Sequence, residues 1–270
     1  MGETVRILAV GDIVGRPGRR AFLALVGSLV RRSRAEFVIV NCENAAGGFG
    51  VTPEIAEELL AGGADCLTSG NHIWKQRSVY GYIHQEPRLI RPANFPEGTP
   101  GRGWGVYPLP GGLVSVVNLM GLAGLEPLEC PFRTFDLLYA EARQASPLVI
   151  VDFHAESTSE KAAFGYYVDG RASLVFGTHT HVQTADERVL PKGTGFISDI
   201  GMTGPEESVI GVEKECVIAR FLTRMPVRFE VPDGPALLCG LVAELDRETG
   251  RAVRLERIQE RLGSAAQALR

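Results

Sequence analysis

Two of the five histidines in this chain of 270 residues lie one residue apart, in the sequence Gly177-Thr178-His179-Thr180-His181. They follow an apolar run, residues 172–176, that predicts a short buried strand. Imidazole is the commonest side-chain ligand of transition metals. A His-x-His pair at the end of a strand therefore indicates a metal site at the mouth of a sheet. The pair alone leaves open a second interpretation, two loop histidines with no such task.

Polar residues with the same chemistry follow four other predicted strands, at residues 5–10, 37–40, 66–68 and 148–151. The full candidate set holds four of the five histidines and consists of Asp12, Asn41, Glu43, Asn44, Asn71, His72, His154, His179 and His181. Ligands of open α/β sheets gather beyond the carboxyl ends of the strands. We therefore expect these side chains to lie close together.

The donor types in this set indicate which metals it suits. Carboxylate, amide and imidazole together suit Mn, Fe or Zn, whereas Ca and Mg prefer shells of oxygen alone. The donors are also too many for one tetrahedral zinc ion. Two metals about 3.5–4 Å apart, bridged by a carboxylate, would accommodate them. We expect two divalent or trivalent transition-metal ions, with Fe or Mn favoured and Zn as the alternative.

Helices are predicted between the strands that must position these residues. Apolar residues at helical spacing predict one helix that starts near Pro17 and another over residues 133–145. Thr52 before Pro53, and the capping box that begins at Ser157, predict two more. Apolar strands that alternate with helices indicate a layered α/β core.

The remaining segments are expected to add antiparallel strands. Residues 106–109 and 113–117 predict a strand pair, and residues 216–258 alternate apolar and polar positions, which favours a second sheet or a mixed one. Residues 198–205 are rich in turn formers and predict a loop, and the last dozen residues predict a helix or a disordered tail. Since no repeat or long linker divides the chain, we expect residues 1–270 to form a single domain.

Composition excludes some classes of function. The chain is 45% hydrophobic and 22% charged, with a net charge of −4 and a pI near 5.8, which argues against a protein that binds nucleic acid non-specifically. No apolar run approaches the ~20 residues of a membrane helix, and the N-terminus does not resemble a signal peptide. The five cysteines are scattered, without Cys-x-x-Cys spacing, and most lie in apolar runs. They predict buried reduced thiols and a cytoplasmic location.

The order and spacing of these motifs resemble the calcineurin-like metallophosphoesterase superfamily, and more closely its YmdB-type branch. The similarity runs from about residue 5 to residue 260, nearly the whole chain. Each motif is weak by itself, but the combination is specific. The motifs are Gly11-Asp12-Ile13-Val14-Gly15, Asn41-Cys42-Glu43-Asn44, Gly70-Asn71-His72, Asp152-Phe153-His154-Ala155-Glu156, Gly177-Thr178-His179-Thr180-His181 and Asp199-Ile200-Gly201-Met202-Thr203-Gly204-Pro205.

The resemblance implies a four-layer α/β/β/α sandwich with a two-metal site. It implies that the first metal is held by Asp12, Glu43, Asn44 and His181, and the second by Glu43, Asn71, His154 and His179. Glu43 would bridge the two, and His72 would be the general acid. The implied activity is hydrolysis of phosphodiesters, with 2′,3′-cyclic nucleotides as suggested substrates, by a hydroxide that bridges the metals. The residues that bind the substrate are left unassigned.

Three positions depart from the wider superfamily and fit the YmdB-type branch. Val14 stands where the first motif usually has a histidine, and Asn44 is expected to fill that coordination position. Glu43 replaces the usual bridging aspartate. Ile73 replaces the usual acidic residue after Asn-His, so His72 lacks that carboxylate partner.

Two other functions remain open at this stage. A phosphomonoesterase would use the same site, and a regulator that binds RNA or a protein partner would carry the metal site as a structural or vestigial feature. The partner expected for the main hypothesis is a small phosphodiester or cyclic nucleotide, with no stable nucleic-acid binding and no membrane. A homo-oligomer is expected because small symmetric assemblies are common among soluble enzymes.

Several nearby residues have supporting or undecided roles. Asn41 is expected to form local hydrogen bonds, and Asp152 and Glu156 to support ligands or begin a helix. His84 is interpreted as a surface or packing residue. The sequence does not decide whether Asp199 and Thr203 border the site, or whether Phe49 and Trp74 stack on a nucleobase or pack in the protein.

Overall fold

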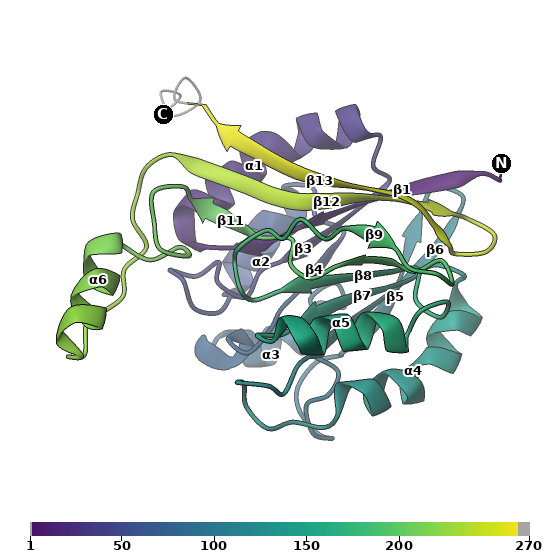
Figure 1. Cartoon of the computed structure of the whole chain (residues 1–270), viewed down its shortest axis with the longest axis horizontal. Coiled ribbons are helices and arrows are strands. Elements are labelled where there is room, and N and C mark those ends of the chain that lie inside the picture. The colour runs from purple at the N-terminus through teal and green to yellow at the C-terminus, as the bar shows by residue number, and fades with distance from the viewer. Residues whose placement is uncertain (1, 264–270) are drawn as a thin grey trace.

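The computed structural model of the chain describes residues 2–263 (Figure 1). Two sheets stack face to face, and helices cover the outer face of each, so the order of layers is α/β/β/α. This is the predicted four-layer sandwich. Within the described residues, no helix is long and apolar enough to span a membrane.

The first sheet contains the N-terminal strands. Its order is β2-β11-β12-β1-β3-β4, with β13 beside β12. The strands are β1 (Thr4–Val10), β2 (Asp12–Ile13), β3 (Phe37–Asn41), β4 (Cys66–Thr68), β11 (Met202–Pro205), β12 (Ala236–Asp246) and β13 (Ala252–Leu262). β1, β3 and β4 are parallel, whereas β12 runs antiparallel to both β1 and β13. Helices α1 (Gly15–Ser33) and α2 (Pro53–Ala61) pack on its outer face, and Thr52 caps α2 as predicted.

The second sheet has the order β5-β6-β7-β8-β10-β9. Its strands are β5 (Trp104–Leu109), β6 (Gly112–Met120), β7 (Val149–His154), β8 (Leu174–Thr178), β9 (Arg188–Val189) and β10 (Gly195–Ile197). β6, β7, β8 and β10 are parallel. Helices α4 (Pro131–Ala145) and α5 (Thr158–Tyr167) cover its outer face. A 3-10 turn η1 (Ile73–Lys75) and helix α3 (Val79–Gln85) follow β4.

Successive side chains of a strand point to opposite faces of its sheet, and both faces of each sheet are covered by another layer. In β1, Val5 and Ile7 point between the sheets, while Leu8 and Val10 point to the layer of α1 and α2. Phe176 of β8 joins Val5 and Ile7 in the interior. Burial of each sheet on two sides produces the continuous apolar runs seen in the sequence.

Three predictions about the C-terminal part were wrong in detail. In the predicted strand region 216–258, residues 216–223 belong to helix α6 (Lys214–Thr223) and residues 224–235 form no strand; Figure 1 shows α6 projecting from the sandwich. Of the residues of α6 only Val217 is buried, so this helix has no buried apolar face from which its period could be predicted. Residues 202–205 form β11, because β2 and β12 supply strand partners that local turn residues cannot reveal. Residues 259–262 extend β13, and the predicted tail over 264–270 lies outside the described residues.

Candidate metal centre

The candidate ligands from both sheets meet beyond the carboxyl ends of the strands. Two groups have ligand atoms within 4.8 Å of one another: Glu43 with His154 and His179, and Asp12 with Glu43 and His181. Asp12 and Glu43 follow β1 and β3 of the first sheet, whereas the histidines end β7 or follow β8 of the second. Glu43 belongs to both groups, so one carboxylate joins two neighbouring ligand sets.

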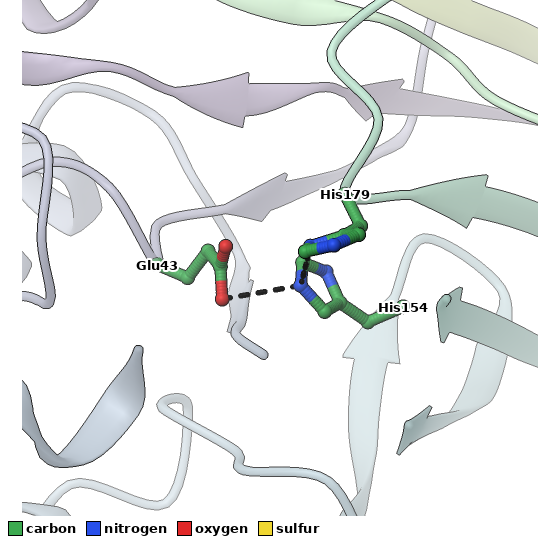
Figure 2. Close-up of side chains that lie close together, drawn as sticks. All are labelled: Glu43, His154 and His179. Carbon is green, nitrogen blue, oxygen red and sulfur yellow. Dashed lines mark hydrogen bonds and ion pairs between the residues drawn. The ribbon is translucent and has the colours of Figure 1, made fainter. Parts of the chain in front are cut away.

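The first group converges on the Nε2 atom of His154. This atom lies 3.2 Å from Glu43 Oε2, 3.1 Å from His179 Nδ1 and 3.0 Å from Asn71 Oδ1. Figure 2 shows the rings of His154 and His179 facing Glu43 across a short gap. The four residues brought together are those that the family resemblance implied for the second metal.

The second group surrounds the other oxygen of Glu43. The Asn44 amide nitrogen donates to Glu43 Oε1 at 3.1 Å and lies 3.0 Å from His181 Nε2, while Asp12 Oδ1 lies 3.9 Å from the same His181 atom. The four residues implied for the first metal are therefore also together. Asn44 directs its nitrogen at this space, so coordination through its oxygen requires the amide to turn over.

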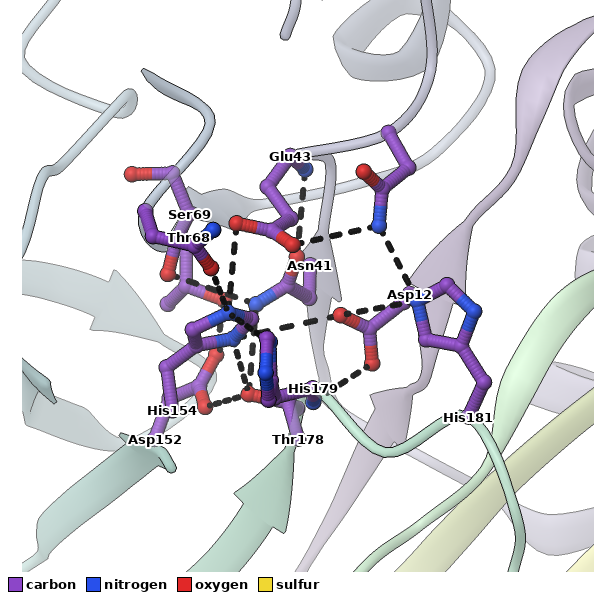
Figure 3. A network of polar contacts seen from close by, with 12 residues as sticks. Asp12, Asn41, Glu43, Thr68, Ser69, Asp152, His154, Thr178, His179 and His181 are labelled. Carbon is purple, nitrogen blue, oxygen red and sulfur yellow. Dashed lines mark hydrogen bonds and ion pairs between the residues drawn. The ribbon is translucent and has the colours of Figure 1, made fainter. Parts of the chain in front are cut away.

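Hydrogen bonds outside the cluster fix which nitrogen of His154 faces inward. Thr178 donates to Asp152 Oδ1 at 2.7 Å, because a carboxylate can only accept. The hydroxyl oxygen of Thr178 lies 2.8 Å from His154 Nδ1 and must accept its proton. In the neutral ring Nε2 then carries no hydrogen and is available to a metal. Asn41 and Thr68 also donate to Asp152, as the network in Figure 3 shows.

The other two histidines are held in the same way. His181 Nδ1 lies 2.8 Å from the Ile210 carbonyl oxygen, which leaves Nε2 directed at Asp12 and Asn44. His179 Nε2 lies 3.1 Å from Glu156 Oε2, which leaves Nδ1 directed at the cluster. Glu156 thus supports a candidate ligand, as predicted.

The backbone of the His-x-His segment is strained. His179 has a φ of 97° and His181 a φ of 65°, values that residues other than glycine seldom adopt. Thr180 between them donates its N–H at 3.1 Å and its hydroxyl at 2.7 Å to Asp199 Oδ2. Asp199 therefore borders the site by restraining the loop that presents both histidines.

Buried charge and unmet hydrogen bonds show that the cluster suits a cation. Asp12 is fully buried and its Oδ1 has no hydrogen-bond partner among the described residues. Burial raises the pKa of Asp12 to about 7, despite the opposing effect of His181 and His154. Gly70 leaves the necessary room, because a Cβ there would lie 2.2 Å from His154 Nε2 and 2.4 Å from Glu43 Oε2. An ion among these donors would complete the shell of Asp12.

The carboxylate and imidazole groups of the cluster shift one another's pKa values. Burial alone lowers the pKa of His154, yet the carboxylates of Glu43 and Asp12 raise it to about 9. Burial alone raises the pKa of Glu43, but His154 and His72 hold it well below its ordinary value. A proton on His154 thus occupies the position of positive charge that a metal ion would take.

His72 lies at the edge of the cluster rather than in it. Its Nδ1 is 2.7 Å from Asn44 Oδ1, and its backbone N–H donates to Glu43 Oε2 at 3.1 Å. Among the described residues its Nε2 has no hydrogen-bond partner and remains available to a substrate. Burial lowers the pKa of His72 below its ordinary value, although Glu43 opposes this effect.

The remaining residues named from sequence divide into near and distant ones. Asn41 hydrogen bonds within the protein, as predicted, and Phe49 lines the cavity beside the cluster. Thr203 is buried and donates to the Cys239 carbonyl. Trp74 packs on Tyr80 and Phe95, which favours the packing interpretation. His84 is exposed in the last turn of α3.

Sequence reasoning missed two supporting residues. Thr178 sets the tautomer of His154, and Lys161 forms an ion pair with Asp199. The signal for Thr178 was its place just before the His-x-His pair. Lys161 had no signal, because a lysine in a helix is ordinarily exposed.

Solved structures place this arrangement among known folds. A hypothetical protein from Thermus thermophilus is 40% identical, with a TM-score of 0.90 over 96% of this chain and 100% of that one. A novel phosphatase from Mycoplasma pneumoniae is 33% identical, with a TM-score of 0.92 over 99% and 97% of the two chains. A four-layer sandwich with two ligand groups that share a carboxylate defines a metallophosphoesterase of the calcineurin-like class, whose members use divalent metal ions.

Sequence comparison narrows the class to one family. The model of the YmdB-like protein family matches residues 8–258, and the chain belongs to that family. The 2′,3′-cyclic-nucleotide 2′-phosphodiesterase of Bacillus subtilis (strain 168) is 50% identical over 254 residues, which are 94% of this chain and 96% of that protein. The resemblance inferred from the motifs is therefore confirmed.

Proposed function

We propose that this chain is a metal-dependent phosphodiesterase that hydrolyses 2′,3′-cyclic nucleotides or similar small phosphodiesters. The observation that carries the proposal is Glu43, whose two carboxylate oxygens face two different ligand groups. The curated Bacillus subtilis relative, named as a 2′,3′-cyclic-nucleotide 2′-phosphodiesterase, supports the substrate class.

The two ligand sets would each hold one metal ion. Asp12, Glu43, Asn44 and His181 would hold the first, and Glu43, Asn71, His154 and His179 the second. When bound, such ions lower the pKa of a water molecule and neutralise the charge that develops on the phosphate oxygens. Mixed nitrogen and oxygen donors favour Fe or Mn, with Zn as the alternative.

His72 would protonate the departing alkoxide. Its Nδ1 is engaged by Asn44, so Nε2 is the nitrogen that would face the substrate. A negatively charged phosphate beside it would raise the pKa of His72, in opposition to burial. With its amide turned over so that the oxygen faces the metal, Asn44 would donate to His72 Nδ1 and leave the proton on Nε2, as proton transfer to the substrate requires.

The test combines metal analysis with turnover. Purified protein should contain about two transition metals per chain and should cleave bis-p-nitrophenyl phosphate and 2′,3′-cyclic nucleotides faster than p-nitrophenyl phosphate. His72→Ala should lower kcat about 10²–10⁴-fold with the metal content retained. His84→Ala, in an exposed histidine of α3, is the matched control and should change neither. Loss of metal from His72→Ala would make His72 a ligand instead, and faster turnover of the monoester would favour a phosphomonoesterase.

We further propose that residues 1–270 act as one domain, as a homo-oligomer in the cytoplasm. The apolar layer between the sheets joins segments from both halves of the chain, which supports one domain. A single cooperative unfolding transition would support one domain. Light scattering coupled to size-exclusion chromatography would give the oligomeric state.

A further inference from the structure

A cavity of about 290 Å³ opens beside the metal centre. Its inner end is formed by His72 and by four of the candidate ligands, Glu43, Asn44, His179 and His181. Its outer wall is apolar and comes from four separate segments, which are the residue between β2 and α1, the glycine-rich loop after β3, the turn after β11 and the irregular stretch before β12. The apolar lining residues are Val14, Phe49, Ile210, Val212, Phe229 and Val231.

Phe49 is the aromatic residue of this wall that lies next to the catalytic candidate. Its side chain is 41% exposed, and its ring centroid lies 5.1 Å from that of His72, with an interplanar angle of 69°. The loop is fixed in place because Gln76 donates to the Phe49 carbonyl oxygen at 2.8 Å. An exposed aromatic ring held at the edge of a polar site offers a flat apolar face to a ligand.

The charges of the cavity limit what lies against that wall. Among the described residues that line it, none is lysine or arginine, and Glu156 and Glu230 add negative charge. A second phosphate would find no cationic partner here. Thr180 lines the cavity too, but its hydroxyl is already committed to Asp199. The wall therefore suits a flat, uncharged group. It has few hydrogen-bond donors or acceptors that could recognise the polar edge of such a group.

We propose that this apolar wall is the subsite for the nucleobase, which stacks on Phe49 with little discrimination among bases. The inference rests on the proposed hydrolysis of 2′,3′-cyclic nucleotides. In such a substrate one ribose joins the phosphate to the base, so a base lies one sugar away from the reacting phosphorus. The ring of Phe49 lies next to that of His72, so a base stacked on Phe49 could be joined through one ribose to a phosphate beside His72.

The test compares a substrate that has a base with one that lacks it. Adenosine 2′,3′-cyclic phosphate and methyl β-riboside 2′,3′-cyclic phosphate differ only at C1′. For the wild type, kcat/KM should favour the nucleotide by about 5- to 150-fold, as expected for stacking on one aromatic ring. In Phe49→Ala this ratio should fall close to 1, while Phe49→Trp should retain it. Phe221→Ala changes an exposed phenylalanine of α6 outside the cavity and should leave the ratio as in the wild type.

A second measurement examines base preference and binding. The four nucleoside 2′,3′-cyclic phosphates should have kcat/KM values within about tenfold of one another, and adenosine 3′-monophosphate should bind Phe49→Ala more weakly in calorimetry. A preference above 100-fold for one base, or an equal loss on both substrates in Phe49→Ala, overturns the nucleobase subsite. If the wild type hydrolyses the two substrates equally, the subsite fails and the proposed function stands. If it hydrolyses neither, the proposed function itself fails.

Discussion

The ammonium group of Lys161 lies 2.7 Å from Asp199 Oδ2, and both side chains are only 2% exposed. Lys161 belongs to α5 on the outside of the second sheet, whereas Asp199 follows β10 and also accepts the N–H and hydroxyl of Thr180. A buried ion pair thus connects the helix layer to the strained segment that carries His179 and His181.

Lys161→Met should destabilise the protein by about 3–5 kcal/mol, because it leaves Asp199 charged and buried without a counter-ion. Urea unfolding of the metal-free protein would measure the change. The control is Lys214→Met, which removes an exposed ion pair with Glu207 and should cost less than about 1 kcal/mol. Equal losses in the two variants would show that the buried pair has no special role.

Thr178→Val should weaken metal binding about 10–100-fold, because His154 loses the acceptor that keeps its proton on Nδ1. Competition with a chromogenic chelator would give the affinity. Thr194→Val removes a buried hydroxyl that donates to the Ala172 carbonyl at the opposite end of the second sheet's strands, just before β10. That control variant should lose stability and keep its affinity, and unaltered affinity in Thr178→Val would contradict the assignment of the tautomer.

Gly70→Ala should displace His154 or Glu43, because the added methyl group would overlap both side chains. We expect loss of at least one metal per chain, measured by elemental analysis after dialysis. Gly81→Ala is the matched change, since a Cβ at this position of α3 meets no atom within 4 Å. It should stabilise the protein by about 0.5–1 kcal/mol and leave the metal content intact.

Asp12→Asn should have opposite effects on the metal-free and metal-loaded proteins. Without metal it removes a buried charge whose Oδ1 lacks a hydrogen-bond partner, so the melting temperature should rise. With metal it removes a ligand, and the stabilisation that binding gives the wild type should shrink. Calorimetric scans with and without chelator would compare the four states. A melting temperature that falls in both conditions would mean that Asp12 is satisfied without a cation.

The stability that Asp186 contributes should disappear in acid. Although burial opposes it, hydrogen bonds from Ser198 and Thr184 hold the pKa of Asp186 below its ordinary value. The folded state therefore binds this proton less readily than the unfolded chain does. The contribution is complete above the unfolded value of about 3.9 and is lost as the pH falls through the lower folded pKa.

Unfolding free energies of the wild type and Asp186→Asn, measured from pH 7 to pH 3, would reveal this. The difference between them should stay constant down to about pH 4 and then narrow. Asp65 provides the contrast, because burial raises its pKa. As the pH rises, the unfolding free energy of the wild type should fall relative to that of Asp65→Asn. Parallel curves for all three proteins would rule out both assignments.

The sequence predicted a layered α/β core and the candidate ligands because their signals are local, whereas the four-layer sandwich was implied by the family resemblance. Apolar runs mark strands buried on both sides, and parallel strands deliver Glu43 and Asn71 to one edge of the first sheet and His154 to the adjacent edge of the second. The features it missed depend on distant partners. β11 exists because β2 and β12 lie beside it, and Lys161 is buried because Asp199 faces it. The apolar residues of α6 suggested a buried strand, but most of them are exposed in the described structure.

The two ligand groups take residues from both sheets, and this has a consequence for how the protein is made. The His179 N–H contacts Asp12 Oδ2 across 167 positions of the chain. Neither half of the sequence can assemble a complete ligand set, and closing such long loops comes late in folding. We therefore expect metal to load only after the two sheets have docked. A partly synthesised chain would hold only an incomplete set of candidate ligands.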